Sequence, residues 1–238
     1  MASTSKQNEE EIPKCVTLKD FKMGGSIRKV GYAEVFLVRK RGGCDDRKYY
    51  AMKRIDTSDN DYKKIEQSVM TEIQVGQKVL GATFFVGLHY VFWSESHVNL
   101  VMEYMGGLDM LYLLTKRKNL LERHARFYLA EVLLAIEALH EMGIVHRNIN
   151  PHNILLDSVG HIGLVNFGSC KQFQPHEEKE RNRAFRETLE YMAPEIIKSE
   201  GHDMAVDWWS FGILAYDMIV GLTPFERNGG ISEDWMYQ

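Results

Sequence analysis

Cysteine is scarce and scattered in this chain of 238 residues. Its three cysteines, Cys15, Cys44 and Cys170, form no C-x-x-C pair and leave an odd number. Disulfide frameworks and zinc sites usually show an even set of cysteines or closely spaced pairs. The sequence therefore argues against both kinds of site, and we expect a reducing compartment, the cytoplasm or the nucleus.

An excess of positive charge and a long hydrophobic run are also missing. The formal net charge is -4, whereas binding to nucleic acid or to acidic membranes draws on basic surface. No apolar span reaches 18 residues. The first dozen residues, MASTSKQNEEEI, are polar and acidic and contain no apolar core of a signal peptide. We therefore expect no nucleic acid and no membrane as partner, and a disordered tail over 1–17.

The first half of the chain alternates short β-rich runs with turn residues. Such runs are VGYAEVFLVRK, YYAMKRI, VGLHYVFW and HVNLVMEYM. Between the second and the third, apolar residues recur at helical spacing over 65–80, despite an interior Gly76. The pattern predicts a sheet with one helix over 18–105, which ends at the Gly106-Gly107 pair.

The second half is mainly helical by its pattern. An apolar stripe runs over 124–142 and stops before Gly143, which suits a helix C-terminus. A second apolar helix is predicted over 204–220, and its Trp and Phe residues suit a core position. The fold class is therefore α+β, with a second unit over 106–238.

Ordered motifs lie around these two helices. The segments IVHRNINPHNILLDSVGHIGLVNFGSCKQF, TLEYMAPEI and AVDWWSFG follow one another, and A-M-K stands at 51–53. They resemble the protein kinase signature H-R-D-x-K-x-x-N, D-F-G, A-P-E and D-x-W-S-x-G with its strand lysine. YMAPEI and AVDWWSFGIL resemble the AGC group, and FVGLHYVF and NILLDSVGHI resemble the N-terminal kinase domains of mitogen- and stress-activated and ribosomal-protein kinases.

The resemblance implies a two-lobed protein-kinase-like fold. Its N-lobe would be an antiparallel sheet with one helix, and its C-lobe would be mainly helical. Protein kinases that resemble this chain continue through three more helices, so we expect a C-lobe that is truncated after the second long helix. Glu195 of A-P-E would then lack the arginine with which the family pairs it.

The resemblance implies that most of the family's nucleotide-binding positions are conserved in type in this sequence. Lys53 would pair with Glu72 and with the α- and β-phosphates of ATP. The other positions that would surround adenine and ribose are Val35, Ala51, Leu155, Met102, Glu103, Met105 and Asp109.

The glycine-rich loop is lost. The motif G-x-G-x-x-G-x-V lets backbone amides approach the phosphates where no side chain intervenes. Arg28, Val30 and Ala33 stand at its three glycines, and Gly31 is out of phase. We interpret the segment as an ordinary β-hairpin turn with a degraded phosphate cradle.

The catalytic positions carry asparagines. Asn148 stands where the family has its aspartate base, and Asn150 stands where it has the loop lysine. Asn166 replaces the D-F-G aspartate that would hold Mg²⁺, so that Asn153 alone remains as a family metal ligand. An amide is not a useful base, and it is a poorer ligand than a carboxylate for Mg²⁺. We therefore expect at most weak ATP binding, without tight binding of Mg²⁺, and keep metal-free adenine binding open.

Three further departures concern control and packing. Ala184 stands at the activation-loop phosphosite and Glu187 where glycine is usual. His152 replaces the acidic residue that favours basic substrates, and we interpret it as a surface histidine. The family stacks an apolar spine through the positions of Gly76, Leu88, His146 and Phe167, and Gly76 would leave a gap in it.

Three functions stay open at this point. The first is a catalytically impaired kinase-like protein, a pseudokinase, that binds a protein partner, a kinase or a kinase substrate, in signalling. The second is a weak ATP-dependent Ser/Thr protein kinase. The third is a non-functional, truncated gene copy.

Overall fold

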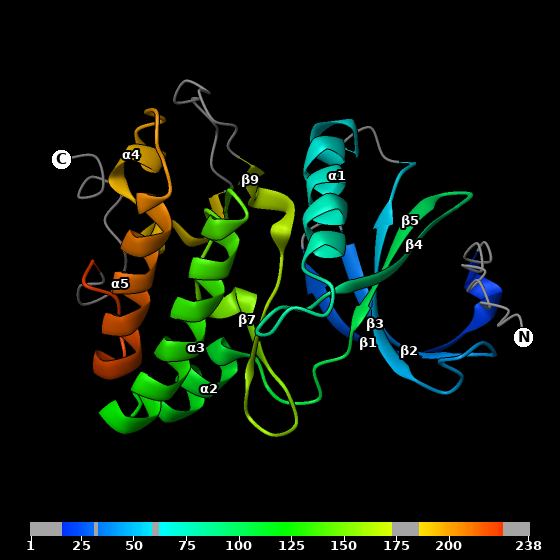
Figure 1. Cartoon of the computed structure of the whole chain (residues 1–238), viewed down its shortest axis with the longest axis horizontal. Coiled ribbons are helices and arrows are strands. Elements are labelled where there is room, and N and C mark those ends of the chain that lie inside the picture. Colours follow the sequence, from blue (N-terminus) through cyan, green and yellow to red (C-terminus); the bar gives the residue numbers. More distant parts are fainter. Residues whose placement is uncertain (1–15, 31–32, 59–61, 173–185, 226–238) are drawn as a thin grey trace, which may run out of the picture.

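The structure, a computed structural model, describes residues 16–30, 33–58, 62–172 and 186–225. A sheet with one helix forms one lobe and a group of helices forms the other (Figure 1). The strands are β1 Phe21–Val30, β2 Ala33–Lys40, β3 Tyr49–Asp56, β4 Leu88–Ser94, β5 His97–Glu103, β6 Ile144–Val145, β7 Ile154–Leu156, β8 Ile162–Leu164 and β9 Lys171–Gln172. The α-helices are α1 Tyr62–Lys78, α2 Met110–Arg117, α3 Glu122–Glu141, α4 Pro194–Ile197 and α5 Ala205–Val220. Short 3-10 helices are η1 Leu18–Asp20, η2 Pro151–Asn153, η3 Phe167–Ser169 and η4 Arg186–Tyr191.

The N-lobe sheet has the strand order β1-β2-β3-β5-β4, with every neighbouring pair antiparallel. β1 and β2 stay paired up to Val30 and Ala33, as the hairpin interpretation predicted. Cross-strand pairing places Lys53 of β3 between Val35 of β2 and Leu100 of β5. The register of the sheet thus fixes the position of Lys53 along β3 relative to the neighbouring strands.

Helix α1 covers one face of this sheet and packs close to β4. Its buried residues include Ile65, Val69 and Ile73, which share a core with Leu88. A Cβ built on Gly76 would lie 3.0 Å from Cβ of Leu88. The expected gap at Gly76 is therefore absent, because the side chain of Leu88 already lies against the glycine.

The C-lobe core lies between α3 and α5. Val132, Ile136 and Leu139 of α3 are fully buried in one cluster with Leu214 and Met218 of α5. Trp208 and Trp209 do not join that core, contrary to the expectation for this helix, and are 38% and 41% exposed. Trp208 contacts the ring of His140 of α3 edge-on, and Trp209 stacks on Phe225.

Main-chain contacts join the two lobes. The N–H of Val86 donates to the carbonyl of Leu164 in β8, and the N–H of Leu164 donates to the carbonyl of Phe84. Phe85 also forms an isolated bridge with Leu164 of β8. These contacts hold β7 and β8 of the second lobe against the edge of the first.

Some expectations lie outside the described residues or stay untested. Ala184 and all but the last two residues of the tail 1–17 lie outside them, and the boundary between 105 and 106 stays a prediction. Cys44 and Cys170 are free. Glu195 is half-buried and forms no ion pair with any residue that the structure describes. Within the described ranges, no helix is both long and apolar enough to cross a bilayer.

Candidate functional site

A cavity of about 560 Å³ lies between the lobes. Its volume is in the range of small-molecule sites. All thirteen predicted site residues line it, and they are Val35, Ala51, Lys53, Glu72, Met102, Glu103, Met105, Asp109, Asn148, Asn150, Asn153, Leu155 and Asn166. Their roles stay predictions, but the fold brings the whole set together.

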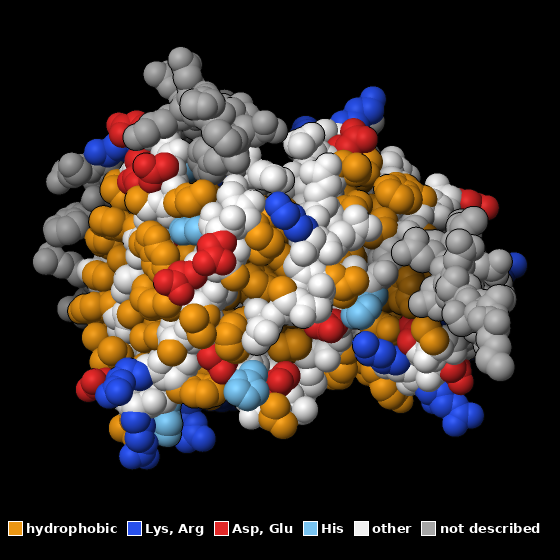
Figure 2. All heavy atoms as spheres, in the orientation of Figure 1, with side chains coloured by type: hydrophobic (Ala, Val, Ile, Leu, Met, Phe, Trp, Pro, Cys, Tyr) orange, Lys and Arg blue, Asp and Glu red, His pale blue; other side chains and the backbone are white. Residues whose placement is uncertain are grey.

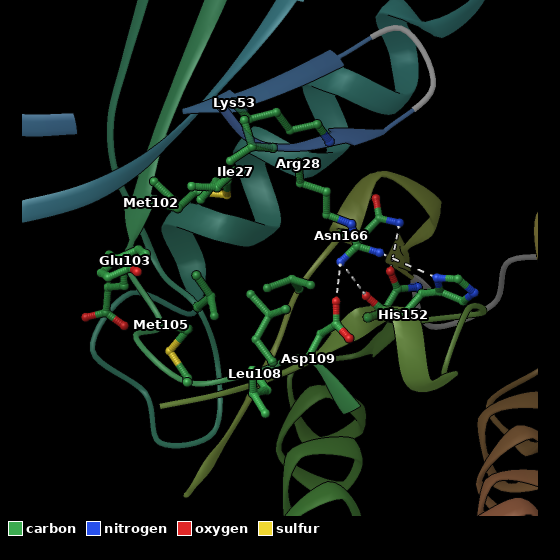
Figure 3. Close-up of a pocket in the computed structure, with 18 of the residues that line it drawn as sticks. Ile27, Arg28, Lys53, Met102, Glu103, Met105, Leu108, Asp109, His152 and Asn166 are labelled. Atoms are coloured by element: carbon green, nitrogen blue, oxygen red, sulfur yellow. Dashed lines mark hydrogen bonds and ion pairs between the residues drawn. The ribbon is translucent and has the colours of Figure 1, made fainter. Parts of the chain in front are cut away.

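One end of the cavity is apolar. Val35 and Ala51 come from β2 and β3, Met102 from β5, and Leu155 from β7. Met105 lies on the segment that links the lobes and also lines this end (Figure 3). Its main-chain N–H and C=O take part in no hydrogen bond with another described residue. A flat heteroaromatic ring would find apolar walls here and a peptide edge for its polar atoms.

The predicted pair of Lys53 and Glu72 is present in the interior. The Nζ atom of Lys53 lies 2.8 Å from Oε1 and 2.7 Å from Oε2 of Glu72. The two side chains are only 10% and 8% exposed. Because both carboxylate oxygens bond to one ammonium, α1 is held against β3, and the ammonium lies at the cavity wall.

The loop that carries Asn148 is held in place by a buried carboxylate. Asp207 of α5 is fully buried, and its Oδ2 and Oδ1 accept the N–H groups of His146 at 2.8 Å and Arg147 at 2.7 Å. Nε2 of His140 lies 2.9 Å from Oδ2 of the same carboxylate. Asp207 therefore holds the main chain just before Asn148 without using the side chain at position 148.

His146 is part of this support, and both of its ring nitrogens contact neutral main-chain groups. Its Nε2 donates to the carbonyl of Val165, while its Nδ1 accepts the N–H of Asn148. Complete burial lowers the pKa of His146 below its usual 6.5, although Asp207 opposes the shift. The neutral ring thus connects the loop to the segment before Asn166.

The asparagines of the cavity bond to one another. Nδ2 of Asn166 donates to Oδ1 of Asn153 at 3.1 Å. Nδ2 of Asn150 donates to Oδ1 of Asn148 at 2.7 Å, and Nδ2 of Asn153 donates to the carbonyl of Asn148 at 2.8 Å. A carboxylate at 166 could only accept hydrogen bonds, so the bond from Asn166 to Asn153 depends on the amide, whereas Asn148 acts only as an acceptor in these bonds.

At the mouth of the cavity, Arg28 of β1 reaches across to the second lobe (Figure 3). Its Nη1 lies 3.5 Å from Oδ2 of Asp109 and 3.4 Å from the carbonyl of His152, and its Nη2 lies 3.4 Å from Nδ1 of His152. His152, which was expected to be a surface histidine, is half-buried and lines the cavity at its mouth. Its ring lies beside the guanidinium because η2 turns it toward the mouth.

Sequence reasoning did not foresee two features of this site. Asp207 was noted only as part of D-x-W-S-x-G, although a carboxylate in an apolar helix is itself a signal of a buried hydrogen-bond acceptor. Arg28 was considered only as a missing glycine. Nothing in its spacing indicates that its side chain points into the cavity.

Comparison with known proteins agrees with the geometry. The family model described as protein kinase domain matches residues 25–237. The chain belongs to the protein kinase domain family. Its two lobes, the Lys53–Glu72 pair and the supported loop are thus features of a protein kinase domain, of the α+β class that the motifs predicted.

Relatives of this protein kinase domain are ribosomal protein S6 kinases of the AGC group. The chain is 42% identical to ribosomal protein S6 kinase alpha-4 of Homo sapiens over 216 residues, which is 90% of this chain and 28% of that protein. It is 39% identical to ribosomal protein S6 kinase alpha-3 of Mus musculus over 82% of this chain and 26% of that protein. The chain therefore spans little more than a quarter of the length of these relatives.

Proposed function

We propose that this protein kinase domain is a pseudokinase that acts by binding a protein partner, a kinase or a kinase substrate, in cytoplasmic or nuclear signalling. The observation that carries the proposal is the amide at position 148. A positioned general base contributes typically ~10²–10⁴-fold to a rate, and a neutral amide does not accept a proton at neutral pH.

The metal positions support the same proposal. Asn166 and Asn153 are hydrogen-bonded to each other through an amide N–H, so Asn153 Oδ1 already has a donor. Mg²⁺ prefers carboxylate oxygens in near-octahedral geometry, and it dehydrates reluctantly. The amide pair is a poor fit for this ion. In kinases the ion neutralises charge on the transferring phosphoryl, so weak retention would add to the loss of the base.

A second candidate, a weak Ser/Thr protein kinase, has specific support. The Lys53–Glu72 pair, the cavity and the loop support by Asp207 are all intact. Loss of the base and of the metal carboxylate together weighs against it.

Phosphotransfer to a basic peptide tests the proposal directly. The purified chain is incubated with labelled ATP and Mg²⁺ or Mn²⁺, beside Lys53→Met and an S6 kinase alpha domain as the active comparator. We expect no transfer above the Lys53→Met level. Turnover that Lys53→Met abolishes would favour the weak kinase instead.

The restored variant Asn148→Asp with Asn166→Asp shows which loss dominates. We expect little recovery, because Arg28, Val30 and Ala33 still stand where the family has glycines. A recovery of several orders of magnitude would mean that the degraded loop has little effect and that the two carboxylates account for the difference.

A further inference from the structure

The side chain of Arg28 extends from β1 into the mouth of the cavity, and its contacts there are with the other lobe rather than with the sheet. It comes from β1 and is half-buried, and the neighbouring Lys29 on the same strand is exposed. Its guanidinium contacts Asp109 at the start of α2 and His152 of η2, both of which belong to the other lobe. Each contact is 3.4–3.5 Å long and individually weak. The three together place the planar group across the mouth.

Both carboxylate oxygens of Asp109 already have a hydrogen-bond donor beside them. Its Oδ1 accepts the N–H of Tyr112 at 2.6 Å and so caps α2, while its Oδ2 faces Arg28. His152 is engaged as well, since a guanidinium only donates and Nδ1 of the ring must therefore accept. A ligand that extends from the apolar end toward Asp109 meets the guanidinium of Arg28 at both residues.

The apolar end remains open beside this contact. Val35, Ala51 and Leu155 form its walls, and the peptide of Met105 offers a donor and an acceptor. These groups suit a flat, uncharged ring system with adjacent polar atoms. A sugar attached to that ring would meet the guanidinium, which already contacts Asp109 and His152.

We propose that Arg28 is a specificity-determining clamp, which restricts the cavity to uncharged heteroaromatic ligands of the size of a nucleobase and excludes those that carry a sugar. The guanidinium holds the two lobes together at the place that a sugar would take. This inference deepens the proposed function, because it names the ligand class of the same cavity. The clamp is tested by ligand binding, whereas the proposed function is tested by turnover, so either proposal can fail without the other.

The test compares adenine and adenosine on the whole chain by ligand-observed NMR titration. Arg28→Ala is compared with Lys29→Ala, which removes the same charge from the same strand at an exposed position. We expect the unmodified chain and Lys29→Ala to bind adenine at least fivefold more tightly than adenosine. Arg28→Ala should improve adenosine binding about fivefold or more, and adenine binding should change less than twofold.

Three outcomes would overturn the clamp. They are equal binding of adenine and adenosine by the unmodified chain, an unchanged preference in Arg28→Ala, and binding of neither probe by any folded variant. Arg28→Lys separates charge from shape, because an ammonium keeps the charge but cannot make the forked contact. It should bind adenosine more tightly than the unmodified chain does. Circular dichroism confirms that each variant is folded.

Discussion

At the scale of single residues, the buried ion pair is the clearest determinant of stability. Lys53 and Glu72 are 8% and 6% exposed as whole residues, so neither charge can recover its hydration if the other is removed. Breaking such a pair typically costs about 3–5 kcal/mol, whereas replacing both partners by apolar groups is often neutral.

Lys53→Met should therefore lower the free energy of unfolding by about 3 kcal/mol, since Glu72 would stay buried without its partner. Urea denaturation measures the change. Lys63→Met, at an exposed position of α1, is the control and should change stability by less than about 0.5 kcal/mol. Lys53→Met with Glu72→Met should recover most of the loss. A loss as large in the double variant would contradict this account.

The residues of the cavity were largely predictable from the motifs, because kinase motifs fix both the residue type and its place on a strand or loop. The direction of Arg28 was not predictable. It depends on how close β1 lies to η2 in space, and Arg28 and His152 are 124 positions apart in the sequence. Local patterns carry no information on such a contact.

At the scale of elements, two helical glycines differ in what surrounds them. A Cβ on Gly76 of α1 would come within 3.0 Å of Leu88 Cβ, whereas one on Gly212 of α5 would meet no atom within 4 Å. Alanine is favoured over glycine in a helix interior by roughly 1 kcal/mol. Packing therefore decides the sign of each substitution.

Gly212→Ala should raise the free energy of unfolding by up to about 1 kcal/mol. Gly76→Ala should lower it by about 1 kcal/mol or more, because a Cβ cannot rotate away from its neighbour and overpacking typically costs about 1–3 kcal/mol. The midpoints of urea unfolding, with unchanged slopes, give both values. A stabilising Gly76→Ala would show that α1 shifts away from β4 easily.

The hairpin of β7 and β8 is tied to α3 by His161 and Glu131. Nδ1 of His161 lies 2.6 Å from Oε1 of Glu131, whose side chain is buried. This hydrogen bond, and then the charge of Glu131, raise the pKa of His161 above its ordinary 6.5. The bond favours the protonated ring in the folded state only, so its contribution is complete below pH 6.5 and is lost as the pH rises through the raised pKa.

His161→Gln should consequently destabilise the protein more at pH 5.5 than at pH 9. The difference in the free energy of unfolding between the unmodified chain and the variant isolates His161, because the other histidines, such as His146, are present in both. Urea midpoints over that pH range provide the measurement. A difference that stays constant or grows with pH would show that the ion pair is not the source.

The bounds of these elements followed the sequence pattern closely. The helix expected over 65–80 is Tyr62–Lys78, and the one expected over 204–220 is Ala205–Val220. The orientation of α5 was less predictable. Apolar residues, Trp208 and Trp209 among them, occur on several faces of this helix, so the sequence pattern does not single out one buried face. The pairing of α5 with α3 selects Leu214 and Met218 for burial and leaves the indoles outside.

At the scale of the whole molecule, the helical lobe carries apolar side chains on its surface (Figure 2). Large exposed apolar residues on α3 and α5 and just beyond α5 are Phe127, Leu134, Trp208, Trp209, Tyr216, Ile219, Val220 and Leu222. Apolar surface of this kind promotes association where it forms a contiguous patch. Stability measurements on this chain should therefore be made at more than one protein concentration.

Nucleotide should stabilise the whole molecule only slightly. A ligand that binds the folded state alone raises stability by RT ln(1 + [L]/Kd), which is about 2.7 kcal/mol at a hundredfold excess over Kd. We expect a small or absent thermal shift with ATP. Any shift that appears should be the same with and without Mg²⁺, because Asn166 replaces the metal-binding carboxylate. A large shift that requires Mg²⁺ would contradict the proposed function and support the weak kinase.

The bridge that Arg28 makes between the lobes has a consequence for how the protein responds to the cell. A contact within one chain acts at a fixed effective concentration, which neither dilution nor metabolism alters. Lobes that close around a nucleotide follow its supply, but lobes held by Arg28 do not. The form in which Arg28 bridges the lobes would then be present at the same fraction in fed and starved cells. The amount of this protein, rather than the energy state of the cell, would decide how much of that form is available to a partner.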